Sequence, residues 1–324
     1  VGKVTSSWTR PDGLRIDRVR TPIGVIACIY ESRPNVIIDV ASLCVKSGNA
    51  VIARGGKEAS NSNDILMSCV AQALASSGLP DSAVQQLEDR RHEAVNELVR
   101  LEGLIDLVIA RGGEKLIQAV SEHARVPVLK HVRGLCHAYI DRDADVGKAI
   151  SIVVNAKTSN PATCNAIETL LVHQAIAPAV LPELLKQLAA KGVEIRGCAR
   201  TCSYYAPCAL ATENDWSTEY LDLILAVKVV DSFEEAIAHI ERYSSGLTDS
   251  IVTQNKETAD RFVREIDSAT VLVNASNRLT DGGQFGLGGE IGISTARVHM
   301  RGPMGLEDLT VTRYVVVGDG HIRT

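Results

Sequence analysis

The stretch Ile23-Gly-Val-Ile-Ala-Cys-Ile-Tyr30 is a continuous apolar run, typical of a strand that is buried on both faces. Apolar residues then recur at helical spacing from Val36 to Lys46, and Gly48 marks the end of that helix. The run Asn49-Ala-Val-Ile-Ala-Arg54 predicts a second strand. Strand, helix and strand in this order predict two parallel strands joined by a right-handed crossover.

The same alternation continues along the chain. Further helices are predicted at about 63–77, 92–101, 114–123, 145–157, 179–190, 233–243 and 257–265. Further strands are predicted at 105–110, 126–129, 169–173, near 193, and at 221–230, 250–253 and 270–274. This pattern predicts an α/β protein with doubly wound parallel sheets. Two strands at 14–20 and 309–317 remain, and the second is expected to pair with the first or with another subunit.

The composition excludes several classes of protein. The chain has 324 residues, enough for two domains, and a formal net charge of −5 offers no broad basic face for nucleic acid. No apolar run approaches the roughly 18 residues of a membrane span, and no signal-peptide pattern opens the chain. Eight cysteines lie mostly in apolar runs, which predicts reduced thiols and a cytoplasmic protein. Cys198, Cys202 and Cys208 cluster without a familiar zinc spacing, so no metal site is predicted.

A candidate nucleophile lies in the stretch Asn155-Ala-Lys-Thr-Ser-Asn-Pro-Ala-Thr-Cys164. Pro161 indicates a turn before Cys164, and the run after it is compatible with a helix. The thiol is therefore expected at the positive end of a helix dipole, which favours the thiolate needed for acyl transfer. The alternative is that Cys164 packs as a small apolar side chain, as free cysteines often do.

Three turns follow predicted strands and fall at the sheet edge where ligands bind in such folds. They contain Asn35, Gly55-Gly56-Lys57 and Arg111-Gly112-Gly113. Glycine lets the backbone approach a phosphate, and a helix N-terminus holds negative charge. Neither Gly-Gly turn matches the G-x-G-x-x-G fingerprint, however, and Arg54 and Lys57 are also compatible with solvated surface charges.

Several stretches together resemble one family over nearly the whole chain. They are Thr21-Pro-Ile-Gly-Val-Ile26, Tyr30-Glu-Ser-Arg-Pro-Asn-Val36, Ala53-Arg-Gly-Gly-Lys-Glu58, Ala110-Arg-Gly-Gly113, Gly134-Leu-Cys-His-Ala-Tyr139, Thr163-Cys-Asn-Ala-Ile-Glu-Thr-Leu-Leu171, Val273-Asn-Ala-Ser276, Phe285-Gly-Leu-Gly288 and Arg301-Gly-Pro-Met-Gly305. In this order they resemble the γ-glutamyl phosphate reductases (glutamate-5-semialdehyde dehydrogenases), a branch of the aldehyde dehydrogenase superfamily. Family members carry a further part ahead of this start, so a truncated or divergent N-terminus is expected.

The resemblance implies an aldehyde dehydrogenase-like fold. Its expected parts are a bridging strand at 1–21, an NADP-binding domain at 22–137, a catalytic domain at 138–300 and an oligomerisation strand at 301–324. The implied reaction converts L-glutamyl 5-phosphate and NADPH to glutamate 5-semialdehyde, phosphate and NADP⁺, the second step of proline synthesis. A homo-oligomer and a functional link to glutamate 5-kinase are implied as well.

The resemblance also assigns roles to residues. Cys164 would attack the acyl phosphate and form a thioester, with the Asn35 side chain and the Cys164 backbone N–H as oxyanion donors. The implied cofactor-binding residues are Arg54, Gly55, Lys57, Gly112, Gly113 and Glu219. Two cations after the second strand favour NADP(H), because they would pair with a 2′-phosphate. Glu219 matches the superfamily's nicotinamide-ribose glutamate, with a surface acid as the alternative.

The substrate carries anionic groups and an ammonium group. Arg278 and Arg297 are therefore candidate anion anchors, and Glu290 is a candidate partner for the ammonium. A purely structural role is the alternative for each of them.

Two other functions remain open. An oxidising NAD(P)-dependent aldehyde dehydrogenase usually carries a glutamate base in a Glu-Leu-Gly-Gly stretch, whereas the corresponding region here reads Gly134-Leu-Cys-His-Ala-Tyr139. A catalytically silent dinucleotide-binding or assembly subunit is suggested by the expected truncation of the N-terminal part. The presence of both Cys164 and Asn35, and of the glycine-rich stretch at 281–290, argues against it.

Overall fold

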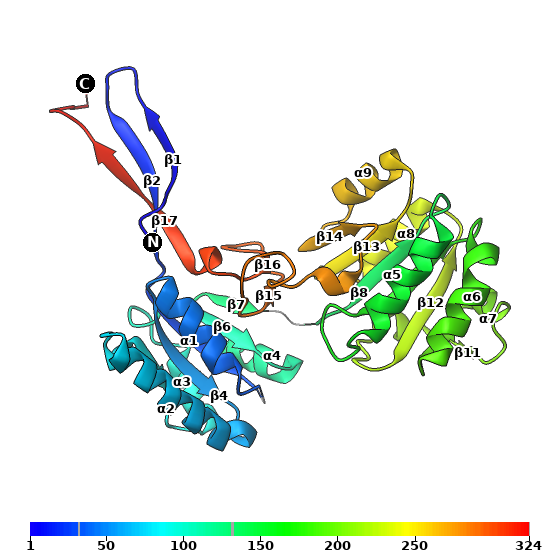
Figure 1. Ribbon diagram of the computed structural model, residues 1–324, viewed down its shortest axis with the longest axis horizontal. Coiled ribbons are helices and arrows are strands. Elements are labelled where there is room, and N and C mark those ends of the chain that lie inside the picture. The colour runs from blue at the N-terminus through cyan, green and yellow to red at the C-terminus, as the bar shows by residue number, and fades with distance from the viewer. Residues whose placement is uncertain (32, 131–132, 324) are drawn as a thin grey trace. The chain divides into compact units, whose positions relative to one another are not determined.

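A computed structural model describes residues 1–31, 33–130 and 133–323 and divides the chain into two compact units (Figure 1). The first unit comprises Val1–His131, Gly286–Ala296 and Pro303–Thr324, and the second comprises Val132–Phe285 and Arg297–Gly302. The functional division at 22–137 and 138–300 remains a prediction. Within the described residues, none of the helices is long and apolar enough to cross a membrane. The same residues contain no group of three or more His, Cys, Asp or Glu side chains placed to hold a metal ion.

A five-stranded parallel sheet in the order β5-β4-β3-β6-β7 forms the centre of the first unit (Figure 1). Its strands are β3 (Val25–Tyr30), β4 (Ala50–Gly55), β5 (Val84–Gln86), β6 (Leu107–Arg111) and β7 (Val128–Lys130). The accompanying helices are α1 (Val36–Lys46), α2 (Ser60–Ser76), α3 (His92–Leu98) and α4 (Glu114–His123). Ala27 and Ile29 of β3 share a buried core with α3 and α4. Helices cover this central strand, which explains its continuous run of apolar residues.

A seven-stranded parallel sheet in the order β11-β10-β12-β9-β8-β13-β14 forms the second unit. Its strands are β8 (Cys136–Ile140), β9 (Ile167–His173), β10 (Glu194–Gly197), β11 (Ala209–Leu210), β12 (Ile224–Val230), β13 (Thr248–Val252) and β14 (Thr270–Val273). Its helices are α5 (Val146–Thr158), α6 (Ala177–Ala190), α7 (Ala199–Cys202), α8 (Phe233–Tyr243) and α9 (Lys256–Glu265).

Helices cover both faces of this larger sheet. Ala138 and Leu170 pack in the core that contains α5 and α6, whereas Tyr139 and Leu171 pack in the core that contains α8 and α9. Neighbouring residues of one strand point to opposite faces, so both faces must be covered when every position is apolar. The predicted doubly wound α/β fold is confirmed.

A three-stranded antiparallel sheet in the order β1-β2-β17 completes the first unit and extends from its main sheet as an arm (Figure 1). Its strands are β1 (Val4–Thr9), β2 (Arg15–Pro22) and β17 (Thr310–Val317), and Val315 pairs with Asp17. The last predicted strand therefore pairs with the predicted strand near the start of the chain. The remaining elements are β15 (Ile293–Ser294), β16 (Gly302–Pro303) and the 3₁₀ turns η1 (Lys57–Ala59), η2 (Asp81–Ala83), η3 (Glu213–Ser217), η4 (Asn277–Leu279) and η5 (Glu307–Leu309).

One local expectation is wrong. Cys164 does not begin a helix, because the chain turns after α5 and enters β9 at Ile167. Every residue of β9 is buried, and a run of this length with no exposed position suits a central strand better than an amphipathic helix. The helix dipole therefore has no part in the environment of Cys164. By contrast, the helix predicted at about 145–157 is present, and Asp145 caps it, since its side chain accepts a hydrogen bond from the backbone N–H of Lys148 over 2.8 Å.

Candidate active site

Cys164 is half-buried in the turn between α5 and β9. Gly134 lies directly against its backbone: a Cβ atom at Gly134 would be 2.1 Å from the carbonyl oxygen of Cys164 and 2.6 Å from its Cα. The backbone N–H of Gly134 donates a hydrogen bond to Glu219 Oε1 over 2.7 Å. Only glycine fits against Cys164 at this distance. Through this packing and its hydrogen bond to Glu219, the Gly134 backbone joins the Cys164 turn to the segment that carries Glu219.

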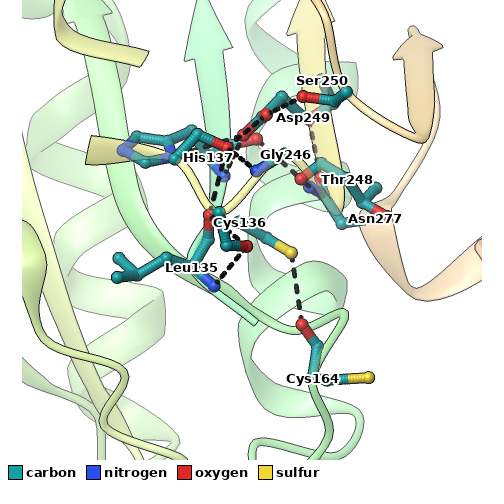
Figure 2. Close-up of polar contacts among 12 residues, drawn as sticks. Leu135, Cys136, His137, Cys164, Gly246, Thr248, Asp249, Ser250 and Asn277 are labelled. Atoms are coloured by element: carbon teal, nitrogen blue, oxygen red, sulfur yellow. Dashed lines mark hydrogen bonds and ion pairs between the residues drawn. The ribbon is translucent and has the colours of Figure 1, made fainter. Parts of the chain in front are cut away.

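A second thiol also contacts this turn. Cys136, the first residue of β8, donates a hydrogen bond from its thiol to the carbonyl oxygen of Cys164 over 3.2 Å (Figure 2). Burial, with further contributions from Asp249 and Cys164, raises the pKa of Cys136 well above its usual range. Cys136 therefore stays protonated and acts as a donor, whereas the sulfur of Cys164 lies on the side away from this contact (Figure 2).

A buried polar network holds β8 against β13. Asp249 Oδ1 accepts a hydrogen bond from the backbone N–H of His137 over 2.8 Å, and its Oδ2 accepts one from Ser244 Oγ over 2.6 Å. The side-chain amide of Asn277 donates to the carbonyl oxygens of His137 and Thr248, each over 3.1 Å (Figure 2). These hydrogen bonds fix β8, whose first residue, Cys136, contacts Cys164.

The sequence did not single out this network. Its members come from separate strands and turns, and only His137 lies in a stretch that carried the family resemblance. The one signal that marks it is the occurrence of polar residues in the buried strands β8 and β13.

The predicted substrate residues lie in different surroundings. Arg278 Nε donates to Ser159 Oγ over 3.2 Å, and its Nη1 contacts Oδ1 of Asn165, the neighbour of Cys164 in the chain. Arg297 instead contacts the carboxylate of Asp267. Glu290 belongs to the first unit. The described contacts therefore bring Arg278 beside the Cys164 turn and hold Arg297 on a carboxylate.

The predicted cofactor residues of the first unit share one edge of its sheet. Tyr30 pairs with Gly55 and with Arg111 in parallel register, so the turns after β3, β4 and β6 leave the sheet together. Gly113 precedes α4, and its N–H donates to Glu31 Oε2 over 2.8 Å. A Cβ atom at Gly112 would lie 2.8 Å from the same oxygen. An anionic oxygen thus already contacts this helix N-terminus, and a phosphate group of a dinucleotide would have to displace the Glu31 carboxylate from it.

The two basic residues after β4 differ in exposure. Arg54 is only 6% exposed, and its guanidinium donates to the carbonyl oxygens of Arg90 over 2.9 Å and Gly55 over 3.1 Å. Gly55 is packed so closely that a Cβ atom there would lie 2.2 Å from Asn63 Nδ2. Lys57 is exposed. Lys57 is therefore the cation available to a ligand, and Arg54 and Gly55 support the turn.

Asn35 immediately precedes α1, and its side chain is exposed. Its amide nitrogen donates one hydrogen bond to Asp39 Oδ2 over 3.2 Å. A side-chain amide carries two N–H groups, so this contact leaves Asn35 able to donate to a ligand. The role of Asn35 as an oxyanion donor remains a prediction.

Comparison with known proteins places the chain in a family. The aldehyde dehydrogenase family model matches residues 3–196 and 212–315. Proteins named gamma-glutamyl phosphate reductase from Caldanaerobacter subterraneus subsp. tengcongensis and Thermodesulfovibrio yellowstonii are 53% and 52% identical, and the matches cover 100% of this chain and 78% and 77% of those relatives.

Solved structures agree with this placement. The gamma-glutamyl phosphate reductase of Thermotoga maritima has a TM-score of 0.97 at 51% identity, covering 100% of this chain and 78% of that one. An acetylating aldehyde dehydrogenase from Geobacillus thermoglucosidasius, with a TM-score of 0.77 at 19% identity over 100% of this chain and 81% of that one, shares the fold. Such enzymes use a nicotinamide dinucleotide as cofactor. This chain therefore belongs to the aldehyde dehydrogenase family and, within it, to the gamma-glutamyl phosphate reductases, which are oxidoreductases.

Proposed function

We propose that this protein reduces L-glutamyl 5-phosphate to L-glutamate 5-semialdehyde with NADPH, releases phosphate, and uses Cys164 as its nucleophile. The observation that carries the proposal is the Cys164 turn. Gly134 and Cys136 contact its backbone on one side, and the sulfur lies on the other side, as a nucleophile requires. A substrate of this kind is the one that the name of the relatives describes.

The proposed first step forms a thioester. The Cys164 thiolate attacks the carbonyl carbon of the acyl phosphate, a carbon–sulfur bond forms, and the carbon–oxygen bond to phosphate breaks. The negative charge on the carbonyl oxygen needs fixed donors, for which we propose the backbone N–H of Cys164 and, on the family resemblance, the amide of Asn35. Loss of one such donor typically lowers kcat by about 10²–10³. Bound NADPH would supply the hydride that converts the thioester to the aldehyde.

We assign the anionic end of the substrate to Arg278. Its guanidinium contacts the side chains of Ser159 and Asn165, which places it beside the Cys164 turn. The guanidinium of Arg297 instead contacts the carboxylate of Asp267. Glu290 remains the proposed partner of the substrate ammonium on the family resemblance alone. Arg278→Ala should therefore raise the KM for glutamate 5-semialdehyde more than Arg297→Ala does, when both are measured in the oxidising direction.

We assign the cofactor phosphates to the turns after β4 and β6. Lys57 would pair with the 2′-phosphate that distinguishes NADP(H) from NAD(H), and Gly112 and Gly113 would hold the diphosphate at the start of α4. Glu219 would contact the nicotinamide ribose, as the resemblance implies.

Replacement of Lys57 tests the choice of cofactor. Lys57→Ala should raise the KM for NADP⁺ roughly tenfold, because a charge-assisted contact worth about 1.4 kcal/mol is lost, and should leave the KM for NAD⁺ unchanged. Lys46→Ala is the matched control, since Lys46 is also exposed but ends α1 at the opposite edge of the sheet. An equal effect of Lys57→Ala on both cofactors would show that Lys57 does not recognise the 2′-phosphate.

The proposed reaction is tested by its reverse. We expect NADP⁺ reduction by glutamate 5-semialdehyde to require inorganic phosphate and to disappear in Cys164→Ala. Activity that is independent of phosphate would indicate an oxidising aldehyde dehydrogenase instead. A protein that binds NADPH but shows no activity in either condition would contradict the proposed reaction.

A further inference from the structure

Lys157 and Glu168 form an ion pair that solvent does not reach. Lys157 Nζ lies 2.6 Å from Glu168 Oε2, and both side chains are 0% exposed. Removing two charges from water costs several kcal/mol per ion, so a buried pair often adds little net stability. Burial raises the pKa of Glu168 to about 7 in spite of the opposing effect of Lys157, which reflects this cost. Stability alone does not explain why the pair is present.

The pair encloses the turn that carries the proposed nucleophile. Lys157 lies one residue before the end of α5, and Glu168 is the second residue of β9. Cys164 falls between them in the sequence. The ion pair therefore joins the two elements from which this turn emerges.

The second oxygen of Glu168 holds another segment. Glu168 Oε1 accepts a hydrogen bond from the backbone N–H of Leu221 over 3.1 Å. Leu221 has φ = 53°, a left-handed conformation that costs a residue with a Cβ atom about 1–2 kcal/mol. Its side chain is 43% exposed, so side-chain burial does not impose this conformation. Such strain persists where surrounding contacts fix the backbone, and Glu168 supplies one of them.

The same segment is held at a second point. Two residues before Leu221, Glu219 Oε1 accepts the hydrogen bond from Gly134 N–H, and Gly134 packs on the backbone of Cys164. The segment 219–221 is thus hydrogen-bonded to two residues next to the Cys164 turn. Glu219 binds Gly134, which packs on Cys164, and Leu221 binds Glu168 of β9, the strand after Cys164. The Glu168 contact sets the direction of the chain immediately after Glu219.

We propose that Glu168, neutralised by Lys157, is a positioning residue that holds Glu219 and Leu221 in register with the Cys164 turn. The proposal rests on the proposed function, in which Glu219 contacts the nicotinamide ribose and Cys164 is the nucleophile. Neither Lys157 nor Glu168 touches a reacting atom in this account. Their effect passes through the 219–221 segment.

Two double variants separate positioning from simple support of the fold. Lys157→Met/Glu168→Gln and Lys157→Met/Glu168→Leu both remove both charges, so neither leaves an unpaired buried ion. They differ in that glutamine keeps a carbonyl acceptor for the Leu221 N–H and leucine does not. Each is measured for thermal midpoint, for the Kd of NADPH by fluorescence, and for kcat in the phosphate-dependent reverse reaction.

The proposal predicts a split between the two variants. The Gln variant should bind NADPH within about threefold of the unmodified protein. The Leu variant should lose about 10- to 100-fold in Kd or kcat at an equal thermal midpoint. Equal Kd and kcat in two folded variants would overturn the proposal and leave the pair a purely structural one. Because NADPH binding needs no turnover, the split remains measurable even if the proposed reaction is wrong.

Hydrogen exchange supplies a test that does not depend on variants folding. The Leu221 amide of the unmodified protein should exchange with deuterium as slowly as the amides within β12, because its N–H donates a hydrogen bond to the buried side chain of Glu168. Exchange at the rate of an unprotected amide would overturn the proposal on its own.

Discussion

The most exacting contact in the second unit is that of Gly134 with the backbone of Cys164. A Cβ atom at 2.1 Å from a backbone carbonyl oxygen cannot be relieved by a side-chain rotation, so the turn itself would have to move. We expect Gly134→Ala to lower kcat by about 100-fold while the protein still folds. Gly147→Ala is the matched control, because its Cβ would lie at an ordinary 3.5 Å from Asp145 Oδ1 inside α5. The kcat and the thermal unfolding midpoint are measured for both variants. Full activity of Gly134→Ala would contradict the account of the Cys164 turn.

Among the elements, helix α8 brings a buried histidine into the core of the second unit. His239 is 5% exposed, and burial, with His137, Lys228 and Arg242 nearby, lowers its pKa from 6.5 to about 3. The neutral ring is therefore the folded form. Its contribution to stability is present above pH 6.5 and is lost as the pH falls from 6.5 towards 3, with a slope of up to about 1.4 kcal/mol per pH unit. Urea unfolding of His239→Phe between pH 4 and 6.5 should show a shallower pH dependence, whereas the exposed His92→Phe should not differ from the unmodified protein.

At the scale of the whole molecule, the two units have separate cores. Each unit contains one of the two tryptophans of the chain. Trp8 lies in β1 with Tyr314 of β17 edge-on at 6.2 Å, and Trp216 is buried in the second unit. Deletion of residues 310–324 should lower the urea midpoint reported by Trp8 and leave that reported by Trp216 unchanged. Trp8→Phe and Trp216→Phe variants assign the two signals. A shift of the Trp216 midpoint by the same amount would contradict separate cores.

Part of the secondary structure is predictable from the sequence. Val36–Lys46, Glu114–His123 and Phe233–Tyr243 are helices at the predicted residues, because their apolar faces repeat at helical spacing. The bridging strand expected at 1–21 is two strands, β1 and β2, and the sequence does not separate them because all residues of β1 are exposed and no burial pattern marks it. The helix expected after Cys164 is wrong because a fully buried strand has no alternation to separate it from a buried helix.

The candidate site was predictable only in part. Cys164 lies in a stretch that carries the family resemblance and Arg278 lies two residues beyond another, and the structure brings Arg278 beside the Cys164 turn. The contacts of Gly134, Glu168 and Leu221 join residues far apart in the sequence, so no local pattern reveals them. The burial of Arg54 is a packing result of the same kind, and it leaves Lys57 as the cation for a ligand.

The central claim is that Cys164 carries a thioester that phosphate cleaves in the reverse direction. The most direct measurement mixes the protein rapidly with NADP⁺ and glutamate 5-semialdehyde without phosphate and follows NADPH absorbance. We predict a burst of about one NADPH per active site, followed by turnover only when phosphate is added, and no burst in Cys164→Ala. Steady turnover without phosphate, or a burst that survives in Cys164→Ala, would contradict the account.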